Sequence, residues 1–580
     1  MSEPQQNEGE GAPAAPPAQE KGAAAKPAAK AAKKAAKAPG PQPAPYALPA
    51  KIAYPLAVLC GFLYFLAFPG VDVWPLAFVA LAPLFVALRG QTPRRALGLG
   101  WTAGFTMTMC GFYWLLEMLR VFSGFPTPVC FLFMAILCGY QAGRIGFFGW
   151  LHGRAEIRGW PAAPVAALAF VASELIFPLL FPWYYGATVH NAVVFAQVAD
   201  LGGGYLVGLV LVAANLGIAE VIHAWRLSRM SAVMVPGADR ETAGYRESAK
   251  DQPRLGPVKP DRRVLAVAVA APLLALVYGY VRLRMVDAQA AAAEPVKVGI
   301  VQGNMPLIGR KQSLKVHTTR TDELKKQGVD LVVWSEGSTG MANRETPDYD
   351  EVRRVVTNRL GVPTIVGALL ARSDGKHYKY FNTALLADRD GKILGRYDKQ
   401  YLLAFGEYLP FGETFPQLYD VSPNSSRFSP GTSIEPLVFG DHRIATLICY
   451  EDILPGFVNG MVNHANPDLL VNLTNDAWFG ESTEPFIHLA LAKMRAIEHR
   501  RYLVRGTNSG VSALIDPVGR VPLHGGTFKE EALIGVAKWM KGKTVYEVIG
   551  DWPWFLATVA IVGMAFATRE RAMQLLKKSA

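Results

Sequence analysis

The feature that most constrains this chain is a succession of apolar stretches, each about long enough to cross a lipid bilayer. A helix takes roughly 20 apolar residues to cross a ~30 Å hydrocarbon layer. Charged residues make up only 18% of the chain, where about 25% is usual for soluble proteins. We place spans near residues 52–69, 72–89, 96–119, 127–150, 161–181, 203–225, 264–282 and 552–568. The sequence therefore predicts a multi-span α-helical membrane domain.

Basic residues mark alternate loops between these stretches. Arg and Lys gather around Arg94, around Arg158, in the 226–263 loop and in the C-terminal RERAMQLLKKSA. The loops of the other parity, such as GVD and RVFSGFP, are nearly free of them. Because loops rich in Lys and Arg stay in the cytoplasm, we expect both termini inside. The region after the seventh span is then outside.

The first fifty residues have a composition of their own. They are rich in Ala, Pro and Lys and have almost no large apolar side chains, so they cannot bury a core. We expect a disordered cytoplasmic tail over 1–50. Such a tail is more often simply solvated than an arm that binds anionic lipid. The expected domains are then 1–50, seven spans over 51–283, an extracytoplasmic domain over 284–545, and a last span with a tail over 546–580.

The polar region alternates the patterns of strands and helices. The segment 381–399 predicts a hairpin that turns through Arg-Asp-Gly-Lys. Helices are expected near 311–327 and 484–501. Further strands are expected at 296–304, 329–337, 362–370, 443–451, 468–476 and within 502–521. Interleaved strands and helices indicate an α/β layered domain, and the hairpins favour a mixed sheet.

Three residues that can carry chemistry stand where strands end: Glu336, Lys399 and Cys449. Taken singly, a Cys there is more often an inert core residue, and a Glu or Lys a surface charge. Together they supply what a thiol acyl transfer needs. A carboxylate takes the thiol proton, and a cation and backbone N–H groups stabilise the oxyanion.

These residues and their neighbours resemble a known family. WSEGS holds Glu336, YDKQYLLAFGEYLPF holds Lys399 and LICYED holds Cys449, a pattern similar to the carbon–nitrogen hydrolase (nitrilase) superfamily. The membrane spans on both sides narrow the resemblance to the apolipoprotein N-acyltransferases. The segments VQGN, NLTNDAWFG and MRAIEHRRYLVRGTNSG support it. The resemblance implies a nitrilase-like αββα sandwich with these three residues as its catalytic triad.

The resemblance also implies a reaction. Such enzymes pass an acyl chain from a glycerophospholipid, typically phosphatidylethanolamine, through a Cys449 thioester. The acceptor is the α-amino group of the N-terminal diacylglyceryl-cysteine of an apolipoprotein, the last step of lipoprotein maturation. We expect a multi-pass protein of the bacterial inner membrane, with its catalytic domain in the periplasm. No cofactor, metal or nucleic acid is expected.

Further residues are assigned supporting roles. Glu407 is expected to orient Lys399 or the amine, although a loop charge is the plain alternative. Tyr450 is expected to offer its N–H to the oxyanion and, with Glu451, to shape the acceptor pocket. Trp478 and Phe479 are placed near the lipid entrance, where a core role is equally common.

Other polar residues remain open. His488 and His499 lie on an expected helix, where a His is more often a core or surface residue than a ligand, and no Cys/His cluster has zinc spacing. Glu117 and Glu174 fall within apolar spans, where carboxylates are costly and often functional. An interfacial place is the plain alternative for Glu117.

Two other classes of protein compete with the acyltransferase. A membrane-tethered amidase would use the same triad, with water as the second acceptor. The FGEYLPF and NDAWFG segments argue against it. A scaffold or transporter with a decayed domain is disfavoured because the triad is intact.

Overall fold

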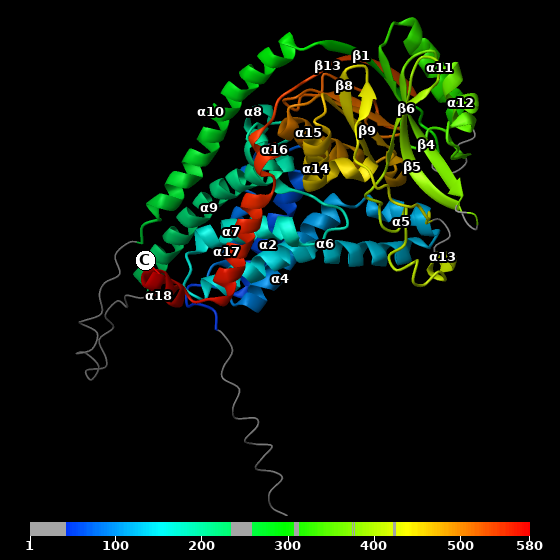
Figure 1. Ribbon diagram of the computed structural model, residues 1–580. Helices are drawn as coiled ribbons and strands as arrows, with labels where there is room; N and C mark the ends of the chain where they lie inside the picture. Colours follow the sequence, from blue (N-terminus) through cyan, green and yellow to red (C-terminus); the bar gives the residue numbers. More distant parts are fainter. Residues whose placement is uncertain are drawn as a thin grey trace, which may run out of the picture. The chain divides into compact units, whose positions relative to one another are not determined.

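The computed structural model describes residues 42–233, 258–306, 312–373, 375, 378–421 and 425–579. Most of the expected tail over 1–50 lies outside these residues, as does much of the basic 226–263 loop. The chain from Ala44 onward forms one compact unit. It contains a bundle of apolar helices and an α/β domain (Figure 1).

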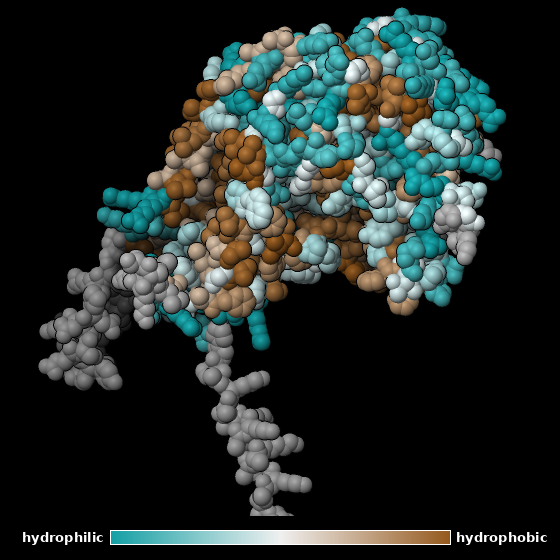
Figure 2. Space-filling model, in the orientation of Figure 1, coloured by the Kyte–Doolittle hydropathy of each residue, from teal (hydrophilic) through white to brown (hydrophobic). Residues whose placement is uncertain are grey.

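The helical part precedes the first strand and receives three further helices from the C-terminal end. Its long helices are α6 (Thr127–Glu156), α9 (Ala199–Val233) and α10 (Arg262–Ala292). Each of the three is long and apolar enough to cross a membrane. The others are α2 (Ala50–Leu66), η1 (Trp74–Phe78), α3 (Ala82–Leu88), α4 (Pro93–Gly111), α5 (Leu115–Ser123), α7 (Ala162–Ile176), η2 (Tyr185–Val189), α8 (Val193–Ala196), α16 (Val545–Ile549), α17 (Trp552–Phe566) and α18 (Arg569–Ser579). Hydrophobic side chains gather over this part of the surface, whereas the α/β domain is mostly hydrophilic (Figure 2).

Two of the expected spans are interrupted. The 72–89 stretch forms η1 and then the short helix α3, each with a proline in its first turn. Proline has no N–H to continue a preceding helix, so each one marks a new start. The 96–119 stretch is divided into α4 and the amphipathic α5, which are separated at residues 112–114. Helix α9 is kinked at Gly203, whose φ of 68° suits a residue without a Cβ.

The α/β domain has two facing sheets. Over the described residues, one has the order β13-β1-β2-β4-β5-β6, with β3 beside β4, and the other has the order β12-β11-β10-β9-β8-β7. Helices α11 (Ser313–Lys326) and α12 (Asp350–Val355) lie on the first sheet, and α14 (Pro455–Ala465) and α15 (Glu484–His499) on the second (Figure 1). The first sheet's strands are β1 (Pro295–Gln302), β2 (Leu331–Val333), β3 (Ala342–Arg344), β4 (Thr364–Ser373), β5 (Tyr378–Ala387), β6 (Ile393–Asp398) and β13 (Glu531–Lys538). The second sheet's are β7 (Leu437–Phe439), β8 (His442–Ile448), β9 (Leu469–Thr474), β10 (Leu503–Thr507), β11 (Ala513–Ile515) and β12 (Leu523–His524).

This arrangement is the αββα sandwich that the sequence predicted. Strands β5 and β6 pair antiparallel as the expected hairpin. Parallel pairs such as β8 with β9 stand beside antiparallel ones such as β7 with β8, so the sheets are mixed. The strands are apolar where the sheets face each other, and this forms a core of Val, Leu and Ile.

A buried ionic junction joins the two parts. Arg500, directly after α15, donates to the carboxylate of Asp200 on α9 at 2.8 Å and to the carbonyl of Gln197 at 3.1 Å. The side chains of Arg500 and Asp200 are only 5% and 2% exposed. Arg282 of α10 reaches the same carboxylate at 2.6 Å. Because water cannot replace a lost partner here, the junction depends on its charges remaining paired.

A substitution at this junction tests its contribution. Arg500→Met should lower the free energy of unfolding by ~3 kcal/mol, because it leaves a buried carboxylate short of a partner. Arg520→Met is the matched control, since the Arg520–Asp287 pair is 42% and 41% exposed and such pairs are worth about 0–1 kcal/mol. Thermal unfolding in detergent measures both, and equal losses would contradict the interpretation.

Candidate active site

Cys449 stands at a strained turn. Strand β8 ends at Ile448, and Cys449 follows at φ 52° before a 3-10 turn, η4 (Cys449–Ile453). A non-glycine residue in the left-handed region costs about 1–3 kcal/mol and persists only where its surroundings hold it. The turn places Cys449 beyond the backbone hydrogen bonds of β8. Asn472 helps to hold it, since its amide donates to the Cys449 carbonyl at 3.3 Å.

Glu451 ties this turn to the strand end that carries the lysine. One carboxylate oxygen accepts from the backbone N–H groups of Gln400 at 2.7 Å and Tyr401 at 3.1 Å. The other accepts from the N–H of Ile448 and the hydroxyl of Tyr397, both at 2.8 Å. Burial raises the pKa of Glu451 to about 7, and the backbone hydrogen bonds oppose that rise. Glu451 lies beneath the turn, and it is absent from the walls of both cavities that reach Cys449.

Lys399 lies between two carboxylates. Its ammonium is 2.7 Å from the carboxylate of Glu407 and 3.7 Å from that of Glu336, and its side chain is 1% exposed. Asn382 of β5 donates to both carboxylates, at 2.6 Å to Glu336 and 3.0 Å to Glu407. The N–H of Leu403 also donates to Glu407, at 2.8 Å. The ends of β2 and β6 and the loop that contains Glu407 are thereby held around the Lys399 ammonium.

The charges around the thiol set its acidity. Burial raises the pKa of the Cys449 thiol well above its usual value, and the Glu336 carboxylate raises it further, whereas Lys399 lowers it. Burial lowers the pKa of Lys399, but Glu407, Cys449 and Glu336 outweigh burial and raise it. Lys399 therefore stays a cation at neutral pH, and the thiol stays protonated until a base takes its proton.

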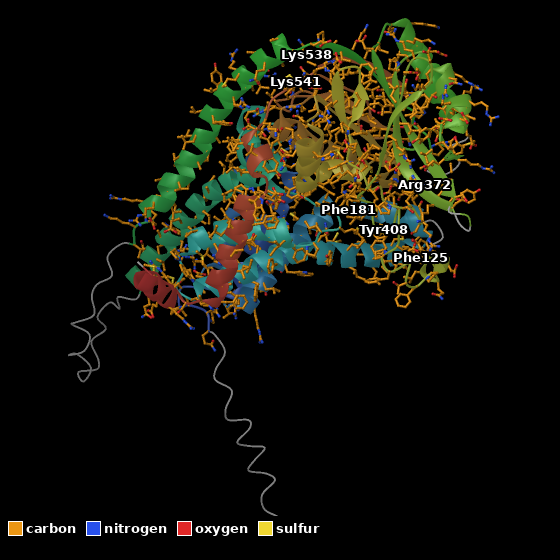
Figure 3. The ribbon with its side chains drawn as sticks, in the orientation of Figure 1. Phe125, Phe181, Arg372, Tyr408, Lys538 and Lys541 are labelled. Carbon is orange, nitrogen blue, oxygen red and sulfur yellow. The ribbon has the colours of Figure 1, made fainter. Side chains whose placement is uncertain are left out.

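Two cavities reach Cys449. A polar cavity of about 250 Å³ is lined by Glu336, Lys399, Cys449 and Trp478, among others. A narrow apolar crevice of about 40 Å³ starts from the same thiol and is walled by residues of both domains. Those walls include Phe112, Trp114, Phe181, Pro182, Tyr450, Phe479 and Leu491. Phe181 and Tyr408 lie where the two domains meet (Figure 3). The thiol therefore faces a polar site on one side and an apolar channel toward the helices on the other.

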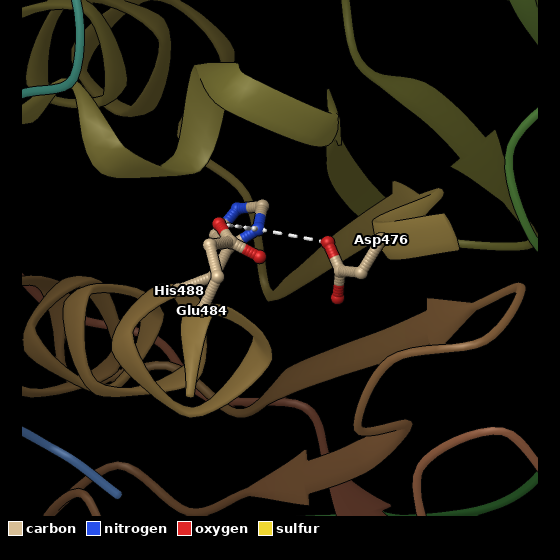
Figure 4. A group of neighbouring side chains, drawn as sticks. All are labelled: Asp476, Glu484 and His488. Carbon is tan, nitrogen blue, oxygen red and sulfur yellow. Dashed lines mark hydrogen bonds and ion pairs between the residues drawn. The ribbon is translucent and has the colours of Figure 1, made fainter. Parts of the chain in front are cut away.

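A buried ionic cluster supports the turn from behind. His488 of α15 lies 2.8 Å from Asp452 and 3.1 Å from Asp476, and Arg505 bonds to the same two carboxylates at 2.8 and 3.2 Å. Figure 4 shows His488 and Glu484 on one helix opposite Asp476. Burial and Arg505 lower the pKa of His488, but the two aspartates outweigh them and raise it to about 10.

The same cluster offers three atoms with the spacing of metal ligands. One atom each from Asp476, Glu484 and His488 lie within 4.8 Å of one another. The two aspartates, however, already balance Arg505 and a protonated His488, and burial raises the pKa of Glu484 well above its usual value. We assign the cluster to support of the Cys449 turn. That the enzyme needs no metal stays a prediction.

The other residues singled out from the sequence have distinct places. The Tyr450 hydroxyl donates to the Leu180 carbonyl of the helical part at 3.0 Å. Phe479 packs edge-on against Trp114 at 5.0 Å between ring centroids. Glu117 pairs with Arg120 at the surface. His499 is buried beside Glu547, at 3.4 Å, away from both cavities.

Comparison with known proteins places the chain in a family. The family model described as apolipoprotein N-acyltransferase N-terminal domain matches residues 60–217, and the carbon-nitrogen hydrolase model matches residues 297–537. A Geobacter metallireducens protein named apolipoprotein N-acyltransferase is 30% identical over 539 residues, 91% of this chain and 97% of its own length. The chain belongs to the apolipoprotein N-acyltransferase family. The sequence-based recognition and the predicted acyl transfer to lipoproteins are thereby confirmed.

Two other matches are a further relative and a solved structure. An apolipoprotein N-acyltransferase of Azotobacter vinelandii is 32% identical over 537 residues, which cover 89% of this chain and 96% of that protein. A branch 10 nitrilase-superfamily structure from Saccharomyces cerevisiae covers 45% of this chain and 95% of its own, at 17% identity and a TM-score of 0.34. Like its relatives, this chain is a membrane-bound acyltransferase.

Asn382 is the residue that the sequence reasoning missed. It lies on β5 of the expected hairpin, and the N–H of Lys399 donates to its carbonyl at 2.8 Å. The signal was present, because a polar residue interrupts the apolar strand opposite the lysine. Its amide fixes the separation between Glu336 and Glu407, so it positions the two carboxylates.

The acidity of Cys449 provides a test of these assignments. Glu336→Gln removes a negative charge that raises the thiol pKa, so Cys449 should be alkylated faster than in the wild type at pH 8–9. Lys399→Met removes the stabilising cation and should make alkylation slower. Acyl transfer should nevertheless fall ~10²–10⁴-fold in Glu336→Gln, because the proton acceptor is gone.

Iodoacetamide labelling of Cys449, followed by mass spectrometry, measures this across pH. Glu413→Gln is the control, since the Glu413 side chain is 74% exposed and pairs with Arg427 away from the thiol. Shifts of the same sign in Glu336→Gln and Lys399→Met would show that the two charges do not act on the thiol as described.

Proposed function

We propose that Glu336, Lys399 and Cys449 carry out acyl transfer in two half-reactions through a thioester on Cys449. The observation that carries this proposal is the polar cavity in which all three residues meet, together with the apolar crevice that starts from the same thiol. One nucleophile then faces both an acyl chain and a polar acceptor. A general base, a cation and a strained thiol turn are the parts such a reaction needs.

In the first half-reaction, Glu336 takes the proton from the Cys449 thiol and the sulfur attacks an ester carbonyl of the phospholipid. Lys399 and the backbone N–H of Tyr450 stabilise the oxyanion. The ester C–O bond then breaks, and the proton on Glu336 passes to the departing lysophospholipid oxygen. The acyl chain stays on sulfur as a thioester, with its first carbons entering the narrow apolar crevice.

In the second half-reaction, the α-amino group of the diacylglyceryl-cysteine attacks the thioester from the polar cavity. Glu336 accepts a proton from the attacking nitrogen, the C–S bond breaks, and the proton returns to the Cys449 sulfur. Glu407 orients Lys399 and borders the site where the amine approaches. Trp478 lines the same cavity, where it can contact either lipid.

We further propose phosphatidylethanolamine as the donor and the bacterial inner membrane as the location. The domains are those expected from the sequence: a cytoplasmic tail over 1–50, spans over 51–283, a periplasmic catalytic domain over 284–545 and a final span and cytoplasmic tail over 546–580. Support comes from the basic loops and from the contacts of the ends. The N–H of Ala44 donates to the carbonyl of Gly90, and the N–H of Arg569 in α18 donates to that of Arg158, both in loops expected to be cytoplasmic.

The thioester is the direct test. Full-length protein in detergent, given phosphatidylethanolamine with a labelled acyl chain and no acceptor, should carry the label in a bond that hydroxylamine cleaves. Cys449→Ala and Glu336→Gln should stay unlabelled, since they lack the nucleophile and the base. A folded wild-type protein that takes no label but hydrolyses an added amide would point to an amidase instead.

A further inference from the structure

Part of the wall of the apolar crevice is built from one irregular segment of the helical part. Residues 177–184, here called the acyl-wall loop, connect α7 to η2. Phe181 and Pro182 of this loop line the crevice beside Cys449. The carbonyl of Leu180 accepts the hydrogen bond from Tyr450, the residue after the nucleophile. The position of this loop therefore sets the width of the crevice next to the thiol.

A single glutamine of α6 holds the centre of the acyl-wall loop. The side-chain oxygen of Gln141 accepts from the N–H of Leu180 at 2.9 Å, and its amide donates to the carbonyl of Phe181 at 2.8 Å. Gln141 is 4% exposed. Its side chain pairs with the N–H of one loop residue and the carbonyl of the next, as the backbone of a neighbouring strand would do. The hydroxyl of Tyr140 also donates to the carbonyl of Pro178.

The same helix fixes the far end of the loop. Arg144, three residues after Gln141 and so on the same side of α6, pairs with Glu174 at 3.0 Å, and both side chains are 1% exposed. The Glu174 oxygen in this pair also accepts from the N–H of Tyr185 at 2.7 Å. Glu174, which the sequence places within an apolar span, therefore anchors the end of the acyl-wall loop. Gln141 is the neutral member of this set, so replacing it alters hydrogen bonding without leaving a buried charge.

We propose that Gln141 is a positioning residue for acyl-chain binding, which acts through Phe181 and Leu180 to hold the wall of the crevice against the chain on Cys449. This inference rests on the proposed thioester at Cys449. Without Gln141, an N–H and a carbonyl of the loop lose their partners in an apolar setting, where leaving them unpaired is costly. The loop then shifts to satisfy them, and the crevice wall no longer lies against the first part of a long chain. A short acyl group, which does not reach along the wall, is unaffected.

The test compares two nitrophenyl esters, acetyl and hexadecanoyl, that acylate the thiol and release nitrophenolate. Full-length Gln141→Leu protein in detergent should lose at least about tenfold in the hexadecanoyl rate, because both hydrogen bonds that hold the acyl-wall loop are lost. Its acetyl rate should stay close to that of the wild type. The ratio of the two rates is the readout, because general damage to the enzyme would lower both.

Two further variants complete the test. Gln91→Leu removes another buried glutamine of the helical part, whose amide donates to the Leu48 carbonyl at 2.8 Å far from the thiol, and should leave the ratio unchanged. Gln141→Glu at mildly acidic pH should keep the ratio near that of the wild type, because a protonated carboxyl both accepts and donates.

An unchanged ratio in Gln141→Leu, or the same change in Gln91→Leu, would overturn the inference. Failure of the proposed function itself looks different. In that case, neither ester would give the wild-type protein a burst of nitrophenolate release that depends on Cys449.

Discussion

The active site depends on a carboxylate that takes no part in the chemistry. Glu336 and Lys399 extend from one sheet of the sandwich and Cys449 from the other, so no single element fixes their separation. Glu451 joins them, because its two oxygens accept hydrogen bonds from both the Cys449 turn and the segment after Lys399. Charge-assisted bonds to backbone N–H groups are short and directional. The separation between Cys449 and Lys399 is therefore fixed through backbone groups of the two strand ends.

The second constraint is that both substrates are lipids. Moving an acyl chain out of the bilayer costs about 0.8 kcal/mol for each CH₂, so a site remote from the membrane would work against a large penalty. Here the catalytic domain rests on the helices through buried polar contacts such as Arg500 with Asp200 and Tyr450 with Leu180. These contacts are directional, and they bring Cys449 to an apolar crevice whose wall is contributed by both parts.

The sequence predicted the fold class and most of the strands because those signals are local. Apolar stretches, strand alternation and the turn in the β5–β6 hairpin are each contained within a few residues. The interruptions within 72–89 and 96–119 were not expected, since hydropathy averages over the prolines and over the break near residues 112–114. At the site, Glu336, Lys399 and Cys449 were found as strand-end residues within motifs. The hydrogen bonds of Asn382 and Gln141 were not found, because their partners lie on other elements and only the packed chain brings them together.

In the proposed mechanism, the charge balance of the polar cavity accounts for one base serving both half-reactions. When Glu336 and Glu407 are ionised and Lys399 is protonated, the three groups carry a net charge of −1. After the first half-reaction, Glu336 has given its proton to the leaving group, so the thioester form has this net negative charge. A cavity of that sign attracts the ammonium form of the second substrate and favours that charged form until a carboxylate takes its proton. Lys399 lies 2.7 Å from the Glu407 carboxylate and 3.7 Å from that of Glu336, so its charge offsets part of their mutual repulsion. By the same argument, the thioester form favours a cationic amine over an anionic group.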